Sequence, residues 1–557
     1  MDTPSKRVRK RGRQRVNRNL RADKDKATEG IEPEPFSLKQ ALLRHDGLKW
    51  LASAQLEFQS LIDDGTWILV PRPKDVHVLT GRWVFKIKRN LDGSIDRYKA
   101  RWVAHGHKQI EGVDFNETFA SVGKLKAVRL FCALAAQMDL SLTQYDVPTA
   151  FLKGKINETI YVEQPHGFVD KDKPDHVCKL LKSLYGLRQA PRQWQKRCSD
   201  FLKSQGFQQC INDDCIYYRV SDTGDRLFLL LYVDDLLVAS STTAQGKIML
   251  KNFQDALVKE FGVKNFGAVD KFFGLHIKQD LNDHSVRIDQ QHYAEEGVAK
   301  FLGSKNVNTK DIPVPSDWNT SEDCPGTDSD RAAISKFPFR EALGFLMWLM
   351  VCTRPDLAFA VSQLSRFMAN PGLRHWHALK AVLRYVAGSA SLGITYKQTV
   401  CADLLVSHSD ASWAGCHDKR RSVSGFDTLL AGAAIHWKSC LQPICAMSTT
   451  EAELIACVSG MQDTLWFRNI LDELQLRQRE PTVMWQDNNG CIGICNNPVN
   501  HKGTKHIDLR KFYLKELVHD KKFELRWIPT KKQPADIFTK ALPRPQFVAC
   551  LQQLGLN

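Results

Sequence analysis

Two adjacent aspartates inside an apolar stretch are the first residues that could do chemistry. Asp234 and Asp235 interrupt the apolar run 227–239, and Asp146 ends another apolar segment. Adjacent carboxylates repel and burial disfavours both charges, so a divalent cation would relieve them; the alternative is a polar hairpin turn. If the two segments are neighbouring strands, three carboxylates converge. Oxygen ligands suit Mg²⁺, and two such ions can activate a 3′-hydroxyl and stabilise a leaving pyrophosphate.

Strands and helices are predicted around these acids. A helical pattern covers 125–138, and a strand runs from Ser141 to Val147. Leu227–Tyr232 and Leu236–Ala239 form two short apolar strands joined by a turn. Further helices are expected from Leu38, with Ser37 as its cap, and over 49–62, 193–205 and 245–261. Helices mixed with hairpins, with acids at strand ends, predict an α+β domain.

A basic hairpin is predicted upstream of the first aspartate. Trp83–Lys88 and Arg97–His105 have strand patterns, and Asp92-Gly93 is a turn sequence. Such a hairpin is either a solvated strand face or a clamp on phosphates. Its candidate cations are Lys86, Lys88, Lys99 and Arg101.

Two more regions follow. Residues 286–400 are mostly helical in pattern, with a polar loop at 315–331. Residues 403–545 form a second α/β unit, with strands ending at Asp410 and Asp487. A helix is expected over 450–475, and another after Pro534.

Composition narrows the classes of protein. The chain has 557 residues, 43% hydrophobic and 25% charged, which is typical of several globular domains. Its formal charge of +16 suits a polyanionic partner. The sequence has no uninterrupted stretch of about 18 apolar residues, so no membrane span is predicted. The 15 cysteines include no C-x-x-C pair, which favours reduced thiols, a cytosolic or nuclear compartment and no zinc.

The N-terminal segment is strongly basic. Nine Lys or Arg residues and no acid lie between Lys6 and Arg21. Residues 1–35 are therefore predicted to be a disordered arm. It is either a solvated tail or a nuclear-import or phosphate-binding segment.

Several long motifs together resemble one family. The segment 229–237, LLLYVDDLL, resembles the Tyr-x-Asp-Asp signature of reverse transcriptases. The segments 144–154, QYDVPTAFLKG, and 184–194, LYGLRQAPRQW, resemble the copia-type (Pseudoviridae) LTR retrotransposon enzymes. Residues 353–356 and 364–376 match the connecting region of the same elements. The resemblance implies a right-hand polymerase of fingers, palm and thumb, followed by a helical connection.

The resemblance also implies roles for residues that match the family's motifs. Asp146, Asp234 and Asp235 would hold the metal ions of the palm. Phe151 would stack under the incoming sugar and favour deoxynucleotides. The sequence is equally consistent with Phe151 as a packing residue of the core. The remaining nucleotide contacts would be Gln189, Lys88 and Lys99. Trp102, where the family usually has Leu, is a departure that concerns template or nucleotide contacts.

A second carboxylate set resembles the ribonuclease H domain that follows the polymerase in this family. Its motifs lie at 407–413, 448–456, 485–488 and 528–540. The implied ligands of two Mg²⁺ ions are Asp410, Glu453, Asp487 and Asp536. Glu451 competes with Glu453, but its spacing from Ser448 is that of a capping box, so we favour Glu453. His506 is expected to order a loop or touch phosphate.

The predicted organisation has five parts. They are a basic disordered arm (1–35), reverse transcriptase fingers and palm (36–285), a thumb or connection-like helical region (286–402), an α/β ribonuclease H-like domain (403–545) and a C-terminal tail (546–557). The chain would be the C-terminal part of a polyprotein whose protease, integrase and nucleocapsid regions lie elsewhere.

The implied activity is copying of RNA into DNA, with cleavage of RNA in the hybrid. Two Mg²⁺ ions are expected at each active site. The expected partners are an RNA template, a DNA or RNA primer, the RNA–DNA hybrid, deoxynucleoside triphosphates and other products of the polyprotein, with no membrane. The expected location is a cytoplasmic virus-like particle, the nucleus or both.

Two alternatives remain open. The chain could be an inactive or recruited remnant that only binds nucleic acid, although all seven acids are present. It could also be another polymerase, such as an intron-encoded or telomere enzyme. The ribonuclease H motifs argue against that alternative.

Overall fold

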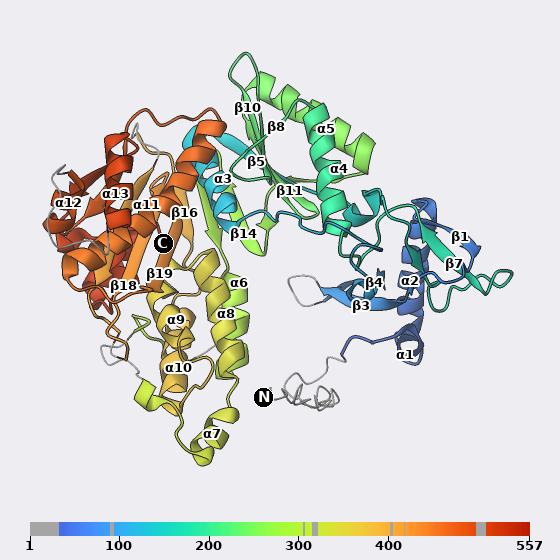
Figure 1. The fold of residues 1–557 in the computed structure, drawn as a ribbon, viewed down its shortest axis with the longest axis horizontal. Coiled ribbons are helices and arrows are strands. Elements are labelled where there is room, and N and C mark those ends of the chain that lie inside the picture. Colours follow the sequence, from blue (N-terminus) through green and yellow to red (C-terminus); the bar gives the residue numbers. More distant parts are fainter. Residues whose placement is uncertain are drawn as a thin grey trace, which may run out of the picture. The chain divides into compact units, whose positions relative to one another are not determined.

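The computed structural model describes residues 33–89, 94–304, 307–314, 321–400, 405–416, 418–496 and 508–557. The basic segment before residue 33, the Asp92-Gly93 turn and His506 lie outside this part. The chain forms two compact units, Met1–Asn116 with Ile156–Arg188, and Glu117–Lys155 with Gln189–Asn557. The predicted region 36–285 therefore contributes to both units. Figure 1 labels the elements.

The described residues of the first unit form sheets and helices. One sheet has the order β1-β7-β6-β2, and β3 and β4 form a separate antiparallel hairpin. Ser37 caps the first helix as predicted, because its hydroxyl accepts the backbone N–H of Gln40. The elements are α1 (Leu38–Leu42), α2 (Gly47–Asp63), β1 (Trp67–Pro71), β2 (Val78–Leu79), β3 (Gly81–Arg89), β4 (Ile95–Ala104), η1 (Gly106–Lys108), β6 (Tyr161–Val162) and β7 (His176–Leu180).

Trp102 belongs to the core of this unit. Its side chain is 1% exposed and packs against the ring of Trp83 at 5.4 Å between centroids. A Cβ at Gly81 would lie 2.4 Å from the Trp102 ring, so the glycine makes room for the indole. The departure from the family's usual Leu at this position is therefore a packing feature in this structure.

The predicted palm occupies the first part of the second unit. Its six-stranded sheet has the order β12-β5-β11-β10-β9-β8, so the strand of Asp146 lies beside the strand of Asp235. The helix predicted over 125–138 has these bounds in the structure. The elements are α3 (Leu125–Met138), β5 (Leu140–Asp146), η2 (Ala150–Lys153), α4 (Ala190–Ser204), β8 (Gln208–Gln209), β9 (Ile216–Val220), β10 (Arg226–Tyr232), β11 (Asp235–Ser241), α5 (Ala244–Phe261) and β12 (Lys264–Ala268).

The middle region is mainly helical, as its sequence pattern predicts, but it also carries a sheet. That sheet has the order β13-β14-β15-β16. Its elements are β13 (Lys271–Phe272), β14 (Leu275–Asp280), β15 (Ser285–Asp289), α6 (Gln291–Leu302), η3 (Ser321–Asp323), α7 (Asp328–Ser335), α8 (Phe339–Cys352), η4 (Pro355–Leu357), α9 (Ala358–Ser365), α10 (Leu373–Gly388) and β16 (Ile394–Lys397).

The C-terminal region is an α/β unit built on a five-stranded sheet. The strand order is β19-β18-β17-β20-β21, with β17, β20 and β21 parallel and the β17-β18-β19 meander antiparallel. The helix α11 packs on β17 and β18. The elements are β17 (Val406–Ser412), β18 (Val423–Leu430), β19 (Ala433–Leu441), α11 (Thr449–Glu473), β20 (Thr482–Gln486), α12 (Asn489–Asn496), α13 (Asp508–His519), β21 (Phe523–Trp527), η6 (Thr530–Lys532), η7 (Pro534–Phe538) and α14 (Arg544–Gln553).

Three local expectations differ from this arrangement. Asp410 lies inside β17 and does not end it. The segment after Pro534 is a 3-10 helix, with the α-helix beginning at Arg544. The segment expected to be a tail forms most of α14 and ends in a β-bridge between Leu556 and Ile394. Packing of buried Leu554 and Leu556 against the rest of the second unit orders this end.

Buried contacts join the C-terminal region to the palm helix α3 within the second unit. The Arg129 guanidinium donates to the carbonyls of Ile435, Val351 and Cys352 at 2.7 to 2.9 Å. It also lies 4.1 Å from the centre of the Trp437 ring. One arginine therefore satisfies backbone acceptors from both α8 and β19. This fixes the C-terminal sheet against α3.

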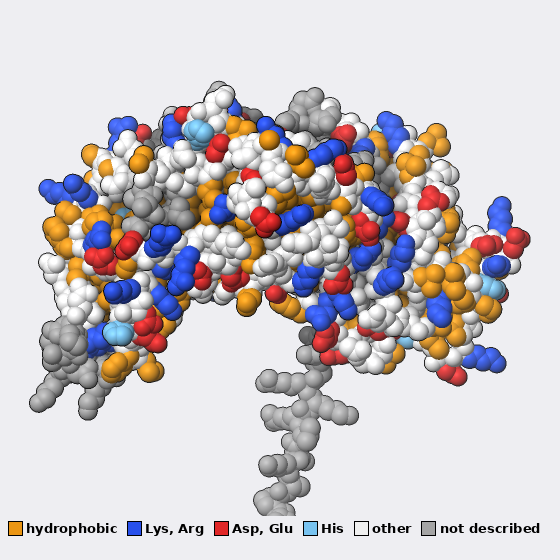
Figure 2. Space-filling model, turned by 90° about the horizontal axis from the view of Figure 1, so that it is seen from above, with side chains coloured by type: hydrophobic (Ala, Val, Ile, Leu, Met, Phe, Trp, Pro, Cys, Tyr) orange, Lys and Arg blue, Asp and Glu red, His pale blue; other side chains and the backbone are white. Residues whose placement is uncertain are grey.

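The described residues carry no helix that is long and apolar enough to cross a membrane. Their cysteines are free thiols. On the face seen in Figure 2, Lys and Arg side chains are spread among Asp and Glu, without one dominant basic patch. The charge of this face is therefore mixed.

Candidate active sites

The first carboxylate set meets at one end of the six-stranded sheet. Asp235 on β11 is the direct cross-strand partner of Asp146 on β5. Directly opposed residues of an antiparallel pair have Cβ atoms about 5 Å apart, so their side chains are neighbours. Asp234 precedes Asp235 in the turn between β10 and β11. The predicted convergence of the two strands is therefore present, and all three aspartates are partly exposed.

A strained turn presents the two adjacent aspartates. Tyr232 pairs with Asp235, so Val233 and Asp234 are the two turn residues. Val233 has φ of 54°, a left-handed conformation that is costly for a β-branched residue. The backbone N–H of Val147 donates to the Asp234 carbonyl at 2.9 Å, and the Trp194 indole donates to the Val233 carbonyl. Both turn carbonyls are thereby held by neighbouring segments.

The charges of this set repel one another. Burial, then the nearby Asp234 and Asp146 carboxylates, raise the pKa of Asp235 to about 6. A hydrogen bond from Gln144 opposes that rise in pKa. A divalent cation would remove this repulsion, and oxygen donors suit Mg²⁺. The donor set therefore fits the predicted metal.

The other residues predicted for this site differ in exposure. Phe151 lies in η2 and packs, partly buried, against an apolar cluster that includes Val147 and Trp194. This packing agrees with the core interpretation of Phe151, and its predicted contact with a sugar stays a prediction. Gln189 precedes α4 and is fully buried, so a nucleotide contact requires its surroundings to open.

The two predicted phosphate-binding lysines belong to the first unit. In the hairpin, Lys88 pairs with Arg97 and Lys99 pairs with Lys86, so these four cations share one face. Lys88 is exposed and Lys99 is half-buried. Lys99 also lies near Glu57, whose pKa burial raises to about 7 while Arg101 and Lys99 lower it. Their predicted phosphate contacts remain predictions.

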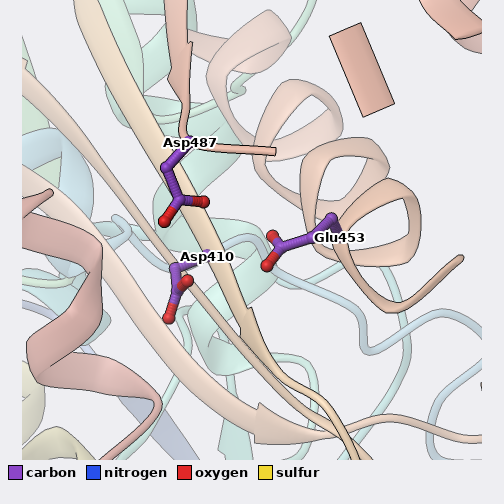
Figure 3. Close-up of side chains that lie close together, drawn as sticks. All are labelled: Asp410, Glu453 and Asp487. Carbon is purple, nitrogen blue, oxygen red and sulfur yellow. The ribbon is translucent and has the colours of Figure 1, made fainter. Parts of the chain in front are cut away.

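The second carboxylate set is more tightly gathered. Asp410 lies in β17, Glu453 in the first turns of α11, and Asp487 directly after β20. Each contributes an oxygen, and the three oxygens lie within 4.8 Å of one another. Among the described residues, this is the group of three possible metal ligands that meets that spacing. Figure 3 shows the three carboxylates close together, with Glu453 directed from its helix toward Asp410 and Asp487.

Asp536 is beside this group but is held by other partners. It is fully buried in η7, and Gln546 donates to its Oδ2 at 2.9 Å. The Lys540 ammonium lies 2.7 Å from its Oδ1 and 3.8 Å from Asp410 Oδ2. Thr539 donates a hydroxyl hydrogen bond to the same oxygen of Asp410. The fourth predicted acid is therefore close to Asp410, but outside the group of three.

The titration of these acids reflects their crowding. Burial, then Asp410 and Asp487, raise the pKa of Glu453 well above its ordinary value. Burial and Asp410 raise the pKa of Asp536 to about 7, although Lys540 opposes the rise. Burial also raises the pKa of Asp487, against a hydrogen bond from Thr530. Carboxylates that repel one another this strongly are a donor set that fits divalent cations.

The structure distinguishes Glu451 from Glu453 by their contacts. Ser448 caps α11 by accepting the Glu451 N–H at 3.2 Å. Glu451 Oε2 accepts the backbone N–H of Met447 at 2.7 Å, one residue before the cap. Glu451 thus stabilises the helix start, much as the capping-box spacing suggested. Glu453 is the one gathered with Asp410 and Asp487.

Sequence reasoning missed the residues that orient these acids. The Gln486 amide donates to Glu453 Oε2 and to the Ser409 hydroxyl, both at 3.2 Å. Gln533 donates to the Ser409 carbonyl at 3.0 Å. Lys540 had a usable signal, because it stands four residues after Asp536 in a segment whose sequence predicted a helix. The glutamines had no signal beyond their place in the quoted motifs.

One protein-family model matches the part of the chain that carries the first carboxylate set. Residues 64–316 match the family described as reverse transcriptase (RNA-dependent DNA polymerase). The chain is 38% identical over 525 residues to the retrovirus-related Pol polyprotein from transposon TNT 1-94 of Nicotiana tabacum. That match covers 94% of this chain and 39% of the tobacco protein. The chain therefore spans about two fifths of that relative's length.

A yeast protein and a solved viral structure are also similar to parts of the chain. A transposon Ty5-1 protein of Saccharomyces cerevisiae is 34% identical over 311 residues, which cover 56% of this chain and 97% of the yeast protein. Among solved structures, a foamy viral protease-reverse transcriptase in complex with an RNA/DNA hybrid matches with a TM-score of 0.45. It is 12% identical, and the match covers 86% of this chain and 54% of the viral chain.

Proposed function

Because the chain belongs to the reverse transcriptases of copia-type retrotransposon Pol polyproteins, we propose that it copies RNA into DNA at Asp146, Asp234 and Asp235. The observation that carries this proposal is the cross-strand pairing of Asp146 with Asp235, beside a turn that presents Asp234. Two bound Mg²⁺ ions would supply activation of a 3′-hydroxyl and stabilisation of a leaving pyrophosphate.

The protein's own groups have defined tasks in this proposal. Asp146, Asp234 and Asp235 hold the ions, and the strained turn at Val233 keeps the two adjacent carboxylates at the end of the sheet. Lys88 and Lys99 bind the triphosphate of a deoxynucleotide as point charges. Phe151 disfavours a sugar that carries a 2′-hydroxyl. Hydrogen bonds from Val147 and Trp194 support the geometry of the turn.

We further propose that the C-terminal region is a ribonuclease H that cleaves the RNA strand of an RNA–DNA hybrid. The grouping of Asp410, Glu453 and Asp487 supports this activity. Asp536 is the proposed fourth ligand. Two Mg²⁺ ions held by these carboxylates would supply activation of a water and stabilisation of charge on the scissile phosphate. Gln486 orients Glu453, and Thr539 orients Asp410.

The proposed partners follow from these two reactions. They are an RNA template, a DNA or RNA primer, the hybrid, deoxynucleoside triphosphates and other polyprotein products. The net charge of +16 supports binding to a polyanion. The proposed location is a cytoplasmic virus-like particle, the nucleus or both.

Primer extension on an RNA template tests the proposal. The reaction contains Mg²⁺, deoxynucleotides and an RNA strand labelled so that cleavage is followed in the same tube. The matched control is the Asp234→Asn/Asp235→Asn protein, which keeps the size of both side chains. We expect this control to lose extension and to retain cleavage of the RNA.

Three other outcomes would change the proposal. Extension that survives in the control contradicts the assigned aspartates. Extension without RNA cleavage in the unaltered protein contradicts the ribonuclease H. If the folded, unaltered protein binds the hybrid but neither extends nor cuts, the chain is the binding-only remnant.

A further inference from the structure

We propose that Lys540 is a tethered cation that occupies the second cation position of the C-terminal carboxylate site and competes with a metal ion there. The inference rests on the proposed ribonuclease H function. It adds a residue that controls how many ions the site binds before any nucleic acid arrives.

The ammonium group of Lys540 lies close to two of the carboxylates. Lys540 Nζ lies 2.7 Å from Asp536 Oδ1 and 3.8 Å from Asp410 Oδ2. It therefore lies between the two carboxylates that would share the second ion. Asp410 also belongs to the group of three carboxylates with Glu453 and Asp487, whose oxygens lie within 4.8 Å of one another.

Both carboxylate oxygens of Asp536 already have partners. Its Oδ2 accepts a hydrogen bond from Gln546, and its Oδ1 is in contact with Lys540. A metal that binds Oδ1 of Asp536 must replace the Lys540 contact, because like charges cannot share one carboxylate oxygen without repulsion. The site as built therefore has one position made only of carboxylates and a second position already neutralised by the chain.

The exposure of Lys540 shows that it can leave. Its side chain is 39% exposed, whereas the Asp536 side chain is fully buried. A lysine is a flexible chain with a compact charge, so it can withdraw without unfolding its surroundings. An incoming phosphodiester offers the ammonium an alternative anion. We therefore infer that nucleic acid promotes filling of the second position.

Counting bound Mn²⁺ tests this inference without relying on activity. The full chain carries Asp234→Asn/Asp235→Asn in every sample, which weakens ion binding at the first site. Free Mn²⁺ is followed by electron paramagnetic resonance at pH 8 without nucleic acid. The Asp410→Asn version gives the background. We expect the protein with Lys540 to bind one ion above that background, and the Lys540→Met protein to bind two.

The second ion should bind at least tenfold more tightly to Lys540→Met than to the protein with Lys540. Lys540→Arg keeps a cation and should behave as Lys540 does. Lys531→Met removes the same charge from an exposed position nine residues away and should leave the count at one. Circular dichroism and thermal unfolding verify that each variant is folded, with Lys540→Gln as a substitute for Lys540→Met.

The outcomes separate this inference from the proposed function. If the protein with Lys540 binds no more Mn²⁺ than Asp410→Asn, the proposed metal site itself is wrong. If it binds one ion and Lys540→Met also binds one, Lys540 does not compete with a metal. Two tight ions in the presence of Lys540, or weaker binding in Lys540→Met, would also overturn the inference.

Discussion

The two carboxylate sites of this chain use the same residue types in different surroundings. Asp146, Asp234 and Asp235 are partly exposed on the ends of strands and in a two-residue turn. Asp410 and Glu453 are buried between a sheet and a helix, and their oxygens and one of Asp487 lie within 4.8 Å of one another. We refer to the first as the open site and to the second as the closed site.

The difference concerns what holds the acids before a metal binds. In the open site, hydrogen bonds hold the backbone of the turn. In the closed site, Gln486, Thr539 and Gln546 bond directly to the carboxylates, and Lys540 supplies a positive charge. Side-chain partners of this kind preorganise a site. In the open site, Gln144 also donates a hydrogen bond to Asp235, while Val147 and Trp194 hold the carbonyls of the turn.

The largest expected effect is a reciprocal loss of the two activities. Asp146→Asn should lower primer extension on the order of 10³-fold and leave RNA cleavage within about twofold, because it removes a ligand from the open site alone. Asp410→Asn should do the reverse. Both activities are measured on one labelled hybrid. Parallel loss of both in either variant would show that the sites are not independent.

A matched pair at the start of α11 tests the closed site more finely. Glu453→Gln should lower RNA cleavage on the order of 10²-fold, since it removes a charged ligand. Glu451→Gln keeps an oxygen that can accept the Met447 N–H, so cleavage should stay within about threefold. The measurement is the single-turnover cleavage rate. Equal losses of the cleavage rate in the two variants would indicate that Glu451 is also a metal ligand.

Selection of the sugar should depend on the open site. Phe151→Val shortens the side chain, so incorporation of ribonucleotides relative to deoxynucleotides should rise about tenfold. The ratio of the two kcat/KM values for primer extension checks this. If Phe151 is only a packing residue, the melting temperature will fall while the ratio stays constant.

The smallest expected effect is a pH-dependent stabilisation by Mg²⁺. An acid whose pKa is raised in the folded state binds its proton more tightly there, so its charge destabilises the fold above that pKa. This destabilisation is absent below the pKa of the acid in the unfolded state, which is near 3.8. Mg²⁺ relieves it, and should raise the melting temperature by several degrees at pH 8 and by less at pH 5.5.

The two sites should differ in the pH range of this effect. Asp536 has a pKa of about 7 and Asp235 of about 6. In the Asp234→Asn/Asp235→Asn protein the closed site remains, and its stabilisation by Mg²⁺ should decline as the pH falls through 7. In the Asp410→Asn protein the open site remains, and its stabilisation by Mg²⁺ should decline as the pH falls through 6. Thermal unfolding by circular dichroism measures both. Stabilisation that is independent of pH would contradict the assigned repulsion.

Much of the local structure could be predicted from the sequence. Apolar periodicity predicted α3 with its observed bounds and placed β10, β11 and α5 to within a residue or two at most ends. The Ser448 spacing predicted the structural task of Glu451. The 3-10 turn after Pro534 was missed, because a short apolar segment with proline at its start has no distinct helical period.

The long-range contacts could not be predicted. The role of Arg129 depends on carbonyl groups of Val351, Cys352 and Ile435, which lie more than 200 residues away. The packing of Trp102 against Gly81 likewise depends on the pairing register of β3 and β4. Every residue has a backbone carbonyl, so a sequence does not show which of them accept a hydrogen bond, and a glycine does not show which ring packs against it.

The sequence by itself determined the residue types of both sites, because carboxylates in apolar surroundings and long ordered motifs are local properties of the chain. It also determined the family. Only the tertiary structure decided which carboxylates are open and which are closed, and that Lys540 lies between Asp410 and Asp536. The physical reason is that burial, repulsion and charge balance depend on distances between elements, and packing of the whole unit sets those distances.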